Sequence, residues 1–275
     1  MASIARKIRR ENKTVGFVPT MGALHEGHLS LIAEARQMSD IVIVSIFVNP
    51  TQFNEQKDFN KYPRDLTSDA ALLTDYQVDY VFAPEAQEIY GENFSTFVYV
   101  DNLTETLEGA SRPGHFRGVA TIVTILFNSI RPDFAFFGQK DAQQIVVIKR
   151  LTRDLGFETE IVVLPTIREE SGLAMSSRNS LLTDEERQSA SIIYQSLREA
   201  KIAFRGGERN ALRLAEIVRQ KIETEPFARV DYIAVVDGET LVPLDKIGED
   251  AALIAVAVRF GLVRLIDNII LNKKQ

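Results

Sequence analysis

The chain has 275 residues, 45% of them apolar and 25% charged, which is typical of a globular protein with a sizeable core in one or two domains. Its 32 basic and 38 acidic residues give a formal net charge of −6, which argues against a general nucleic-acid-binding or anionic-membrane surface. On this acidic background, an enzyme that binds anions needs a local cluster of basic residues.

The chain contains no cysteine, which excludes disulfides, zinc thiolate sites and thiolate nucleophiles. Its basic N-terminus, residues 1–13, lacks the apolar segment of a secretory signal. Ile4 and Ile8 fit a short amphipathic helix there, with an Arg-rich transit peptide as the alternative. No window approaches the roughly 18 apolar residues of a membrane span. We therefore expect a cytoplasmic protein that neither spans a membrane nor binds nucleic acid.

Strands and helices alternate through the first part of the chain. We expect strands at 14–19, 41–48, 80–83, 133–137 and 160–164, and helices through 29–35, 66–76, 119–130 and 142–155. This alternation predicts right-handed βαβ units and an α/β fold with a doubly wound parallel sheet. In such sheets, ligands bind beyond the carboxyl ends of the strands, and several polar motifs of this chain follow strand ends.

The pattern changes in the last hundred residues. Thr183 and Glu186 form a capping box that opens a long helix extending to about Phe204. A second helix at 211–222 and two strands, at 230–236 and 251–258, follow. We predict a smaller α+β domain at 177–275, after a first domain at 1–176.

The motif His25-Glu26-Gly27-His28 stands where the first strand passes into a helix. The positive end of the helix dipole favours a phosphate there and favours neutral imidazoles that donate N–H bonds. Such donors stabilise the charge that develops on a pentavalent α-phosphate. Histidines buried for structural reasons are the competing interpretation. A zinc-protease motif needs one more residue between the histidines, and a P-loop needs Lys and Ser or Thr where His28 and Leu29 stand.

Two other motifs combine polar groups with turn residues. The loop at 111–118 holds two arginines and a histidine between glycines, so it either closes over an anion or forms a solvated turn. The strand that ends near Val48 leads directly into Asn49 and Gln52, whose amides suit a hydroxy-carboxylate, although a simple turn is the default interpretation.

The fourth strand and the domain boundary carry the remaining candidates. After Gly138, Lys140 can bind a phosphate, Asp141 can cap a helix, and Gln144 lies one turn further along. The loop at 174–179 has two hydroxyls and a guanidinium, which is typical of loops that close on triphosphates, although a linker would look similar. The local basic cluster therefore consists of Arg112, Arg117, Lys140 and Arg178.

Taken together, these motifs closely resemble the pantothenate synthetase (pantoate–β-alanine ligase) family. The six motifs that carry the resemblance occupy, in order, residues 19–28, 45–53, 107–115, 138–141, 175–179 and 264–268. The resemblance implies a Rossmann-like domain for ATP and pantoate, a C-terminal lid domain and a homodimer. It also implies the reaction: pantoate attacks the α-phosphate of Mg-ATP to form pantoyl adenylate, and β-alanine then displaces AMP to form pantothenate.

The resemblance also implies roles for individual residues. His28 is the expected catalytic proton donor with His25 as its companion, and Lys140 and Arg178 supply the positive charge at the phosphates. Gln52 and Gln144 would bind pantoate with support from Asn49, and Gln52 would also lie near β-alanine. The implied ATP-binding residues are Met21, Gly22, Ala23, Leu24, His25, Glu26, Gly27, His28, Gly138, Gln139, Lys140, Asp141, Ile167, Met175, Ser176, Ser177 and Arg178.

No dedicated metal cage is evident, so Mg²⁺ is expected to take most of its ligands from ATP and water, with Asp69 as an additional candidate. Two alternative functions stay open at this point. One is a nucleotidylyl transferase that leaves the nucleotide on its product, acting on nicotinamide mononucleotide or phosphopantetheine. The other is a nucleotide-sensing module without catalysis.

Overall fold

The computed structural model describes residues 1–54, 59–60 and 62–272, and the chain divides into two compact units. The first unit comprises Met1–Gly138 and Val147–Pro165, and the second comprises Gln139–Val146 and Thr166–Gln275. The boundary expected between residues 176 and 177 lies inside the second unit, so the loop that precedes it belongs with the C-terminal part of the chain.

The first unit is built on a five-stranded parallel sheet. Its strands are β1 (Val15–Thr20), β2 (Ile41–Ile46), β3 (Tyr80–Phe82), β4 (Phe134–Gly138) and β5 (Glu160–Leu164), in the order β3-β2-β1-β4-β5. The predicted doubly wound α/β fold is confirmed. The order reverses between β1 and β4, so the switch point of the sheet lies beside the carboxyl end of β1, where the His25 motif begins.

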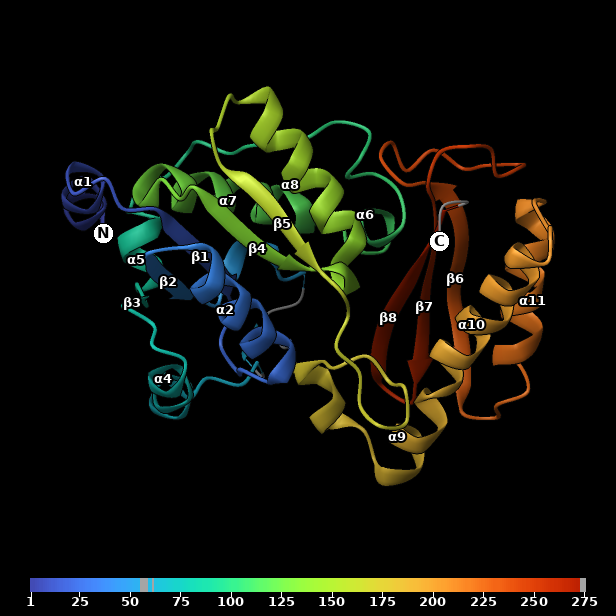
Figure 1. Cartoon of the computed structure of the whole chain (residues 1–275). Helices are drawn as coiled ribbons and strands as arrows, with labels where there is room; N and C mark the ends of the chain where they lie inside the picture. Colours follow the sequence, from blue (N-terminus) through green and yellow to red (C-terminus); the bar gives the residue numbers. More distant parts are fainter. Residues whose placement is uncertain (55–58, 61, 273–275) are drawn as a thin grey trace. The chain divides into compact units, whose positions relative to one another are not determined.

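Helices cover both faces of this sheet (Figure 1). The helices are α1 (Ala2–Arg10), α2 (Glu26–Met38), α4 (Leu66–Asp75), α5 (Ala86–Ile89), α6 (Glu108–Ser111), α7 (His115–Ile130) and α8 (Ala142–Asp154), with a 3₁₀ turn η1 (Pro50–Gln52). On one face, Ile32 of α2 and Leu73 of α4 pack with Val44. On the other face, Phe17 of β1 meets Phe127 of α7 edge-on. The central strands β1, β2 and β4 are largely buried, which explains their continuous apolar runs, whereas the edge strands β3 and β5 are more exposed.

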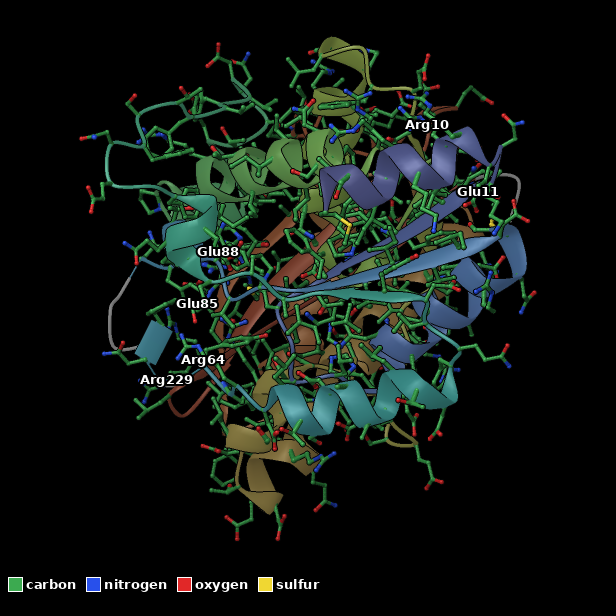
Figure 2. The ribbon with its side chains drawn as sticks, turned by 90° about the vertical axis from the view of Figure 1, so that its left-hand side faces the viewer. Arg10, Glu11, Arg64, Glu85, Glu88 and Arg229 are labelled. Atoms are coloured by element: carbon green, nitrogen blue, oxygen red, sulfur yellow. The ribbon has the colours of Figure 1, made fainter. Side chains whose placement is uncertain are left out.

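Helix α1 is amphipathic, as expected. Ala5 and Ile8 are buried, whereas Arg10 and Glu11 at its C-terminal end lie at the surface (Figure 2). Figure 2 also labels Glu85 and Glu88, which start α5 with a capping box: the carboxylate of Glu88 accepts the backbone N–H of Glu85 at 2.8 Å. None of the helices within the described ranges is long and apolar enough to cross a membrane.

The second unit is a three-stranded antiparallel sheet with helices on one face (Figure 1). Its elements are η2 (Gln139–Asp141), η3 (Ser177–Leu181), α9 (Asp184–Ala190), α10 (Ile192–Arg205), α11 (Ala211–Ile222), β6 (Ala228–Asp237), β7 (Ala252–Phe260) and β8 (Val263–Leu271). Leu197 of α10, Leu214 of α11 and Val256 of β7 are fully buried in the core between the helices and the sheet.

Two expectations for the second unit were wrong. The long helix after Thr183 is interrupted at Ser191, which ends α9 and begins α10 while its own backbone stays in the right-handed helical region. The capping box of Thr183 and Glu186 is present as predicted. A third strand, β8, follows β7 through a tight turn at Gly261, and its polar Asp267 and Asn268 interrupt the apolar pattern that identifies a strand.

Candidate active site

A left-handed turn joins β1 to α2. Gly22 and Ala23 have φ angles of 79° and 52°, and such values favour glycine and are uncommon for alanine. The buried carboxylate of Asp69 on α4 stabilises this turn by accepting the N–H of Ala23 at 3.0 Å and of Leu24 at 2.8 Å. Asp69, expected as an additional magnesium ligand, therefore fixes the conformation of the loop that leads into the histidine motif.

The two histidines of the motif cap α2 reciprocally. His25 is the N-cap residue, one position before the helix, and its Nδ1 accepts the N–H of Gly27 at 3.1 Å. Nδ1 of His28 accepts the N–H of His25 at 3.4 Å, and the ring centroids are 4.1 Å apart. A nitrogen that accepts a hydrogen bond carries no proton, so both rings in this arrangement hold their proton on Nε2. His25 and His28, each with its proton on Nε2, therefore stand at the start of α2, at the positive end of the helix dipole.

The side chain of Gln52 is held in place by a buried amide. Nδ2 of Asn49 donates to Oε1 of Gln52 at 3.1 Å and to the carbonyl of Gly118 at 3.1 Å. Nε2 of Gln52 donates to Sδ of Met21. Asn49 is 1% exposed, and a buried amide that loses a hydrogen bond destabilises the folded protein, so these bonds hold Asn49 in one orientation. The structure therefore brings together Met21, Asn49 and Gln52, three of the predicted site residues.

Tyr90 completes the surroundings of Asn49, although the sequence did not single it out. Its hydroxyl donates to Oδ1 of Asn49 at 2.7 Å and contacts Oγ1 of Thr51 at 3.2 Å. Burial raises the pKa of Tyr90 above its ordinary value, despite the opposing effect of the hydrogen bonds with Thr51 and Asn49. The hydroxyl therefore remains a donor at neutral pH.

The Arg-Pro-Gly-His loop contacts the same segment. The carbonyl of Gln52 lies 2.8 Å from Nδ1 of His115 and 3.3 Å from Nη2 of Arg112. Nη1 of Arg112 lies 3.3 Å from Nε2 of His115, and since arginine only donates, Nε2 accepts and Nδ1 donates. The guanidinium of Arg117 stacks 3.8 Å from the centre of the Phe97 ring. In this structure, Arg112 and His115 thus position Gln52.

In the second unit, the turn that carries Lys140 is tied to β8. Nδ2 of Asn268 donates to the carbonyls of Gln139 at 3.0 Å and Lys140 at 2.9 Å. The ammonium of Lys140 lies 3.6 Å from a carboxylate oxygen of Asp141, and its side chain is 20% exposed. Gln144, one turn further along α8, is half-buried.

A short hairpin presents the Met175–Arg178 loop. The N–H of Met175 donates to the carbonyl of Ile167 at 2.9 Å, and Oγ of Ser176 accepts the N–H of Arg178 at 3.3 Å. Burial raises the pKa of Glu169 in this hairpin, but hydrogen bonds from Arg187 and Asn179 and the charge of Arg187 outweigh that effect and hold the pKa below its ordinary value. An ionised Glu169 therefore connects the hairpin to α9.

Comparison with known proteins covers nearly the whole chain. The model of the family described as pantoate-beta-alanine ligase matches residues 1–270. The chain belongs to the pantoate-beta-alanine ligase family. Two of its most similar relatives are pantothenate synthetases. That of Carboxydothermus hydrogenoformans is 56% identical over 96% of this chain and 93% of the relative, and that of Thermosipho africanus is 52% identical over 98% and 97%.

Solved structures of pantoate-beta-alanine ligases share the fold. The crystal structure of pantothenate synthetase from Thermus thermophilus matches with a TM-score of 0.90 and 45% identity, covering 96% of each chain. The pantoate-beta-alanine ligase of Francisella tularensis, solved in complex with beta-gamma ATP and beta-alanine, matches with a TM-score of 0.79 and 38% identity, covering 98% of this chain and 95% of the other.

Two residues of this pantoate-beta-alanine ligase family member have contacts that the sequence did not reveal. Asp267 and Asn268 belong to a motif of the family resemblance, but only the structure shows what they hold. A buried acid or amide within an apolar strand is the signal that identifies such residues, because it must find partners.

Proposed function

We infer that this chain joins pantoate to β-alanine in a reaction that consumes ATP. The observation that carries this conclusion is the match of the pantoate-beta-alanine ligase model along residues 1–270. Consistent with it, the relative from Francisella tularensis was solved with beta-gamma ATP and beta-alanine. The helix start at His25-His28 offers what such chemistry requires, a set of N–H donors at the positive end of a helix dipole.

We propose that the reaction proceeds through an acyl adenylate. A carboxylate oxygen of pantoate attacks the α-phosphorus of ATP, and the bond to the β,γ-pyrophosphate breaks. The amine of β-alanine then attacks the activated carbonyl, AMP leaves with the bonding electrons, and the amine loses its proton. The first step is needed because a carboxylate is a poor acyl donor, whereas AMP is a good leaving group.

The two histidines act in the first step in this proposal. Because Nδ1 of each ring accepts a backbone N–H, each ring carries its proton on Nε2, and in this proposal Nε2–H donates to the substrate. A donor aimed at the α-phosphate oxygens stabilises the negative charge of the pentavalent transition state and needs no reorganisation to do so. We assign His28 as the main donor, with His25 as its companion.

We propose that pantoate binds at Gln52 and Gln144, with Asn49 in support, and that β-alanine binds next to Gln52. The contacts of Gln52 favour this role. Asn49 holds its side chain, and Arg112 and His115 hold its backbone. A residue fixed from both ends is preorganised to bind a substrate and loses little conformational entropy on doing so.

Lys140 and Arg178 supply positive charge to the phosphates in this proposal. The remaining ATP contacts come from the loop after β1 and from the segments around η2 and η3, as expected from the family resemblance. These proposed ATP-binding residues are Met21, Gly22, Ala23, Leu24, His25, Glu26, Gly27, His28, Gly138, Gln139, Lys140, Asp141, Ile167, Met175, Ser176, Ser177 and Arg178.

We also propose that ATP is used as its magnesium complex. Among the residues that the structure describes, no group of three or more His, Cys, Asp or Glu side chains could hold a metal ion. Asp69 uses both carboxylate oxygens on backbone N–H groups. This donor set fits a Mg²⁺ that takes most of its ligands from ATP oxygens and water.

Three further assignments complete the proposal. As the family resemblance implies, residues 1–176 act as the ATP- and pantoate-binding domain and residues 177–275 act as a lid, although the Lys140 turn and the Met175–Arg178 loop group with the C-terminal residues in the structure. The protein forms a homodimer. It works in the cytoplasm, where the absence of cysteine is compatible with a reducing environment.

One assay tests the function. The purified chain is incubated with ATP and pantoate, with and without β-alanine, and AMP and pyrophosphate are quantified. We expect pyrophosphate exchange with pantoate alone, and continuous AMP release only when β-alanine is added. A stable dinucleotide product would instead indicate a nucleotidylyl transferase, and ATP binding without any exchange would indicate a sensing module.

A further inference from the structure

Two consecutive residues on β8, Asp267 and Asn268, are buried although both are polar, with 3% and 4% of their surface exposed. Successive side chains of a strand point to opposite faces of its sheet. We propose that Asp267 and Asn268 form a positioning pair that holds, from the two faces of one strand, the Lys140 turn and the hairpin before Arg178. This inference rests on the proposed function.

Asn268 holds the Lys140 turn through all of its side-chain polar atoms. Nδ2 donates to the carbonyls of Gln139 and Lys140, and Oδ1 accepts Nε2 of Gln139 at 3.0 Å. An amide is required for this arrangement, since it offers two donors and one acceptor in a plane. The backbone on both sides of Lys140 is thereby fixed to β8. The side chain that carries the ammonium therefore extends from a fixed position.

Asp267 holds the hairpin from the other face. Its carboxylate binds the guanidinium of Arg168 through two bonds, of 2.6 and 3.0 Å, and Arg168 also donates to the carbonyl of Gly172 at 3.2 Å. The same guanidinium lies 3.7 Å from the ring centre of Tyr194 on α10. Arg168 also pairs across the hairpin with Ala174, immediately before the Met175–Arg178 loop.

Stability alone does not account for this pair. A buried ion pair is often no more stabilising than well-packed apolar residues of the same volume. Every other buried side chain of β8 that faces the helices is apolar, including Leu265 and Leu271. A polar pair in this strand is explained if its purpose is to hold two separate segments in one fixed arrangement, as the partners that orient catalytic residues do.

The first test compares two substitutions on the same sheet. Asn268→Ala removes the bonds to the Lys140 turn, and we expect pantoate-dependent ATP–pyrophosphate exchange to fall about 10-fold or more, the scale for lost orienting partners. The second half-reaction, from supplied pantoyl adenylate and β-alanine, should keep its wild-type rate. The matched control is Asp231→Asn, which breaks the 2.7 Å ion pair of Asp231 with Arg264 and should leave both rates unchanged.

The second test asks whether Asn268 acts through Lys140. In a Lys140→Ala background, Asn268→Ala should change the exchange rate by less than about two-fold, because independent sites would show the full effect again. For Asp267, the double variant Arg168→Met with Asp267→Leu replaces the ion pair with apolar residues and guards against misfolding. We expect its melting temperature to stay near that of wild type while exchange falls.

Four outcomes would each overturn the inference. For Asn268→Ala, they are a wild-type exchange rate in the folded variant, equal losses in both half-reactions, or an effect that adds to that of Lys140→Ala. For the double apolar variant, the outcome is full activity. These outcomes leave the proposed function intact. A wild-type chain that releases no AMP with pantoate and β-alanine would instead refute the function itself.

Discussion

At the scale of single residues, the three histidines of this chain fall into two protonation patterns. His25 and His28 accept backbone N–H groups at Nδ1 and so carry their proton on Nε2, whereas His115 donates from Nδ1 to the carbonyl of Gln52. In the first pattern the ring caps a helix through Nδ1, and in the second the ring holds a neighbouring segment through Nδ1. A sequence motif does not distinguish these patterns, because they depend on which backbone groups meet each ring.

The proposed donor role of His28 leads to the first prediction. His28→Ala should lower the rate of adenylate formation at least ~100-fold, the scale for a lost transition-state donor. Single-turnover release of pyrophosphate measures that step directly. The free energy of unfolding should be followed in parallel, because the substitution also removes the acceptor for the N–H of His25. Unchanged pyrophosphate release in a folded variant would exclude His28 from the mechanism.

At the scale of elements, α7 and η1 approach each other too closely for a side chain at Gly118. A Cβ there would lie 2.5 Å from the carbonyl oxygen of Thr51 and 2.7 Å from the backbone nitrogen of Gln52. The carbonyl of Gly118 also accepts a bond from Asn49. The position of Gln52 therefore depends on this glycine.

Gly118→Ala should accordingly destabilise the protein by about 1–3 kcal/mol, the cost of overpacking, and raise the KM for pantoate by displacing Gln52. Chemical denaturation and steady-state kinetics measure the two effects. Gly248→Ala is the control, since a Cβ at Gly248 meets nothing within 4 Å. Equal behaviour of the two variants would show that the close approach has no influence on the site.

The hairpin and α9 are joined through Glu169, which gives a pH-dependent prediction. The folded-state pKa of Glu169 is below the ordinary value of 4.5, so its contribution to stability is present above that pH and disappears as the pH falls through the lowered value. Glu169→Gln should reduce the free energy of unfolding by about 1–2 kcal/mol at neutral pH.

Denaturation at a series of pH values checks this expectation. The difference in the free energy of unfolding between wild type and Glu169→Gln should close as the pH is lowered below 4.5. Glu170→Gln, at the exposed neighbouring position, serves as the control. A difference that is the same at neutral and at acid pH would contradict the assigned role of the Glu169 carboxylate.

The elements also show what could be predicted from the sequence. The strands of the parallel sheet were predicted to within about two residues, because they are short apolar runs between helical segments and the central three are largely buried. The break at Ser191 was missed because a single serine is a weak signal. Strand β8 was missed because Asp267 and Asn268 interrupt its pattern, and they do so because they bind other segments. The prediction thus failed at β8, where two polar residues that bind distant segments replace the apolar residues expected in a buried strand.

At the scale of the whole molecule, six motifs in order predicted the family, and the comparisons confirm it. The residues alone did not specify pantoate, because substrate identity depends on how donors converge in space. The contacts around Gln52 illustrate the difference. Asn49 was a candidate from its position after a strand, but Tyr90, Arg112 and His115 reach the same segment from other parts of the chain.

The proposed homodimer is tested on the intact chain. Sedimentation equilibrium should give a mass about twice that of one chain, and the mass should be independent of protein concentration in the range used for the activity assay. Addition of ATP and pantoate should not change it. A mass equal to that of one chain, in a sample that releases AMP with pantoate and β-alanine, would show that a single copy suffices for the reaction.

The contacts of Asn268 also have a consequence for how the protein is made. The carbonyls that it binds belong to residues 129 and 128 positions earlier in the chain. During translation, the five-stranded sheet has all of its strands once β5 has left the ribosome, whereas Asn268, which binds the Lys140 turn, emerges only later with β8. Domains fold as units while the chain grows. A nascent chain can therefore complete its first unit early, yet its Lys140 turn gains the contacts with Asn268 only after β8 has emerged.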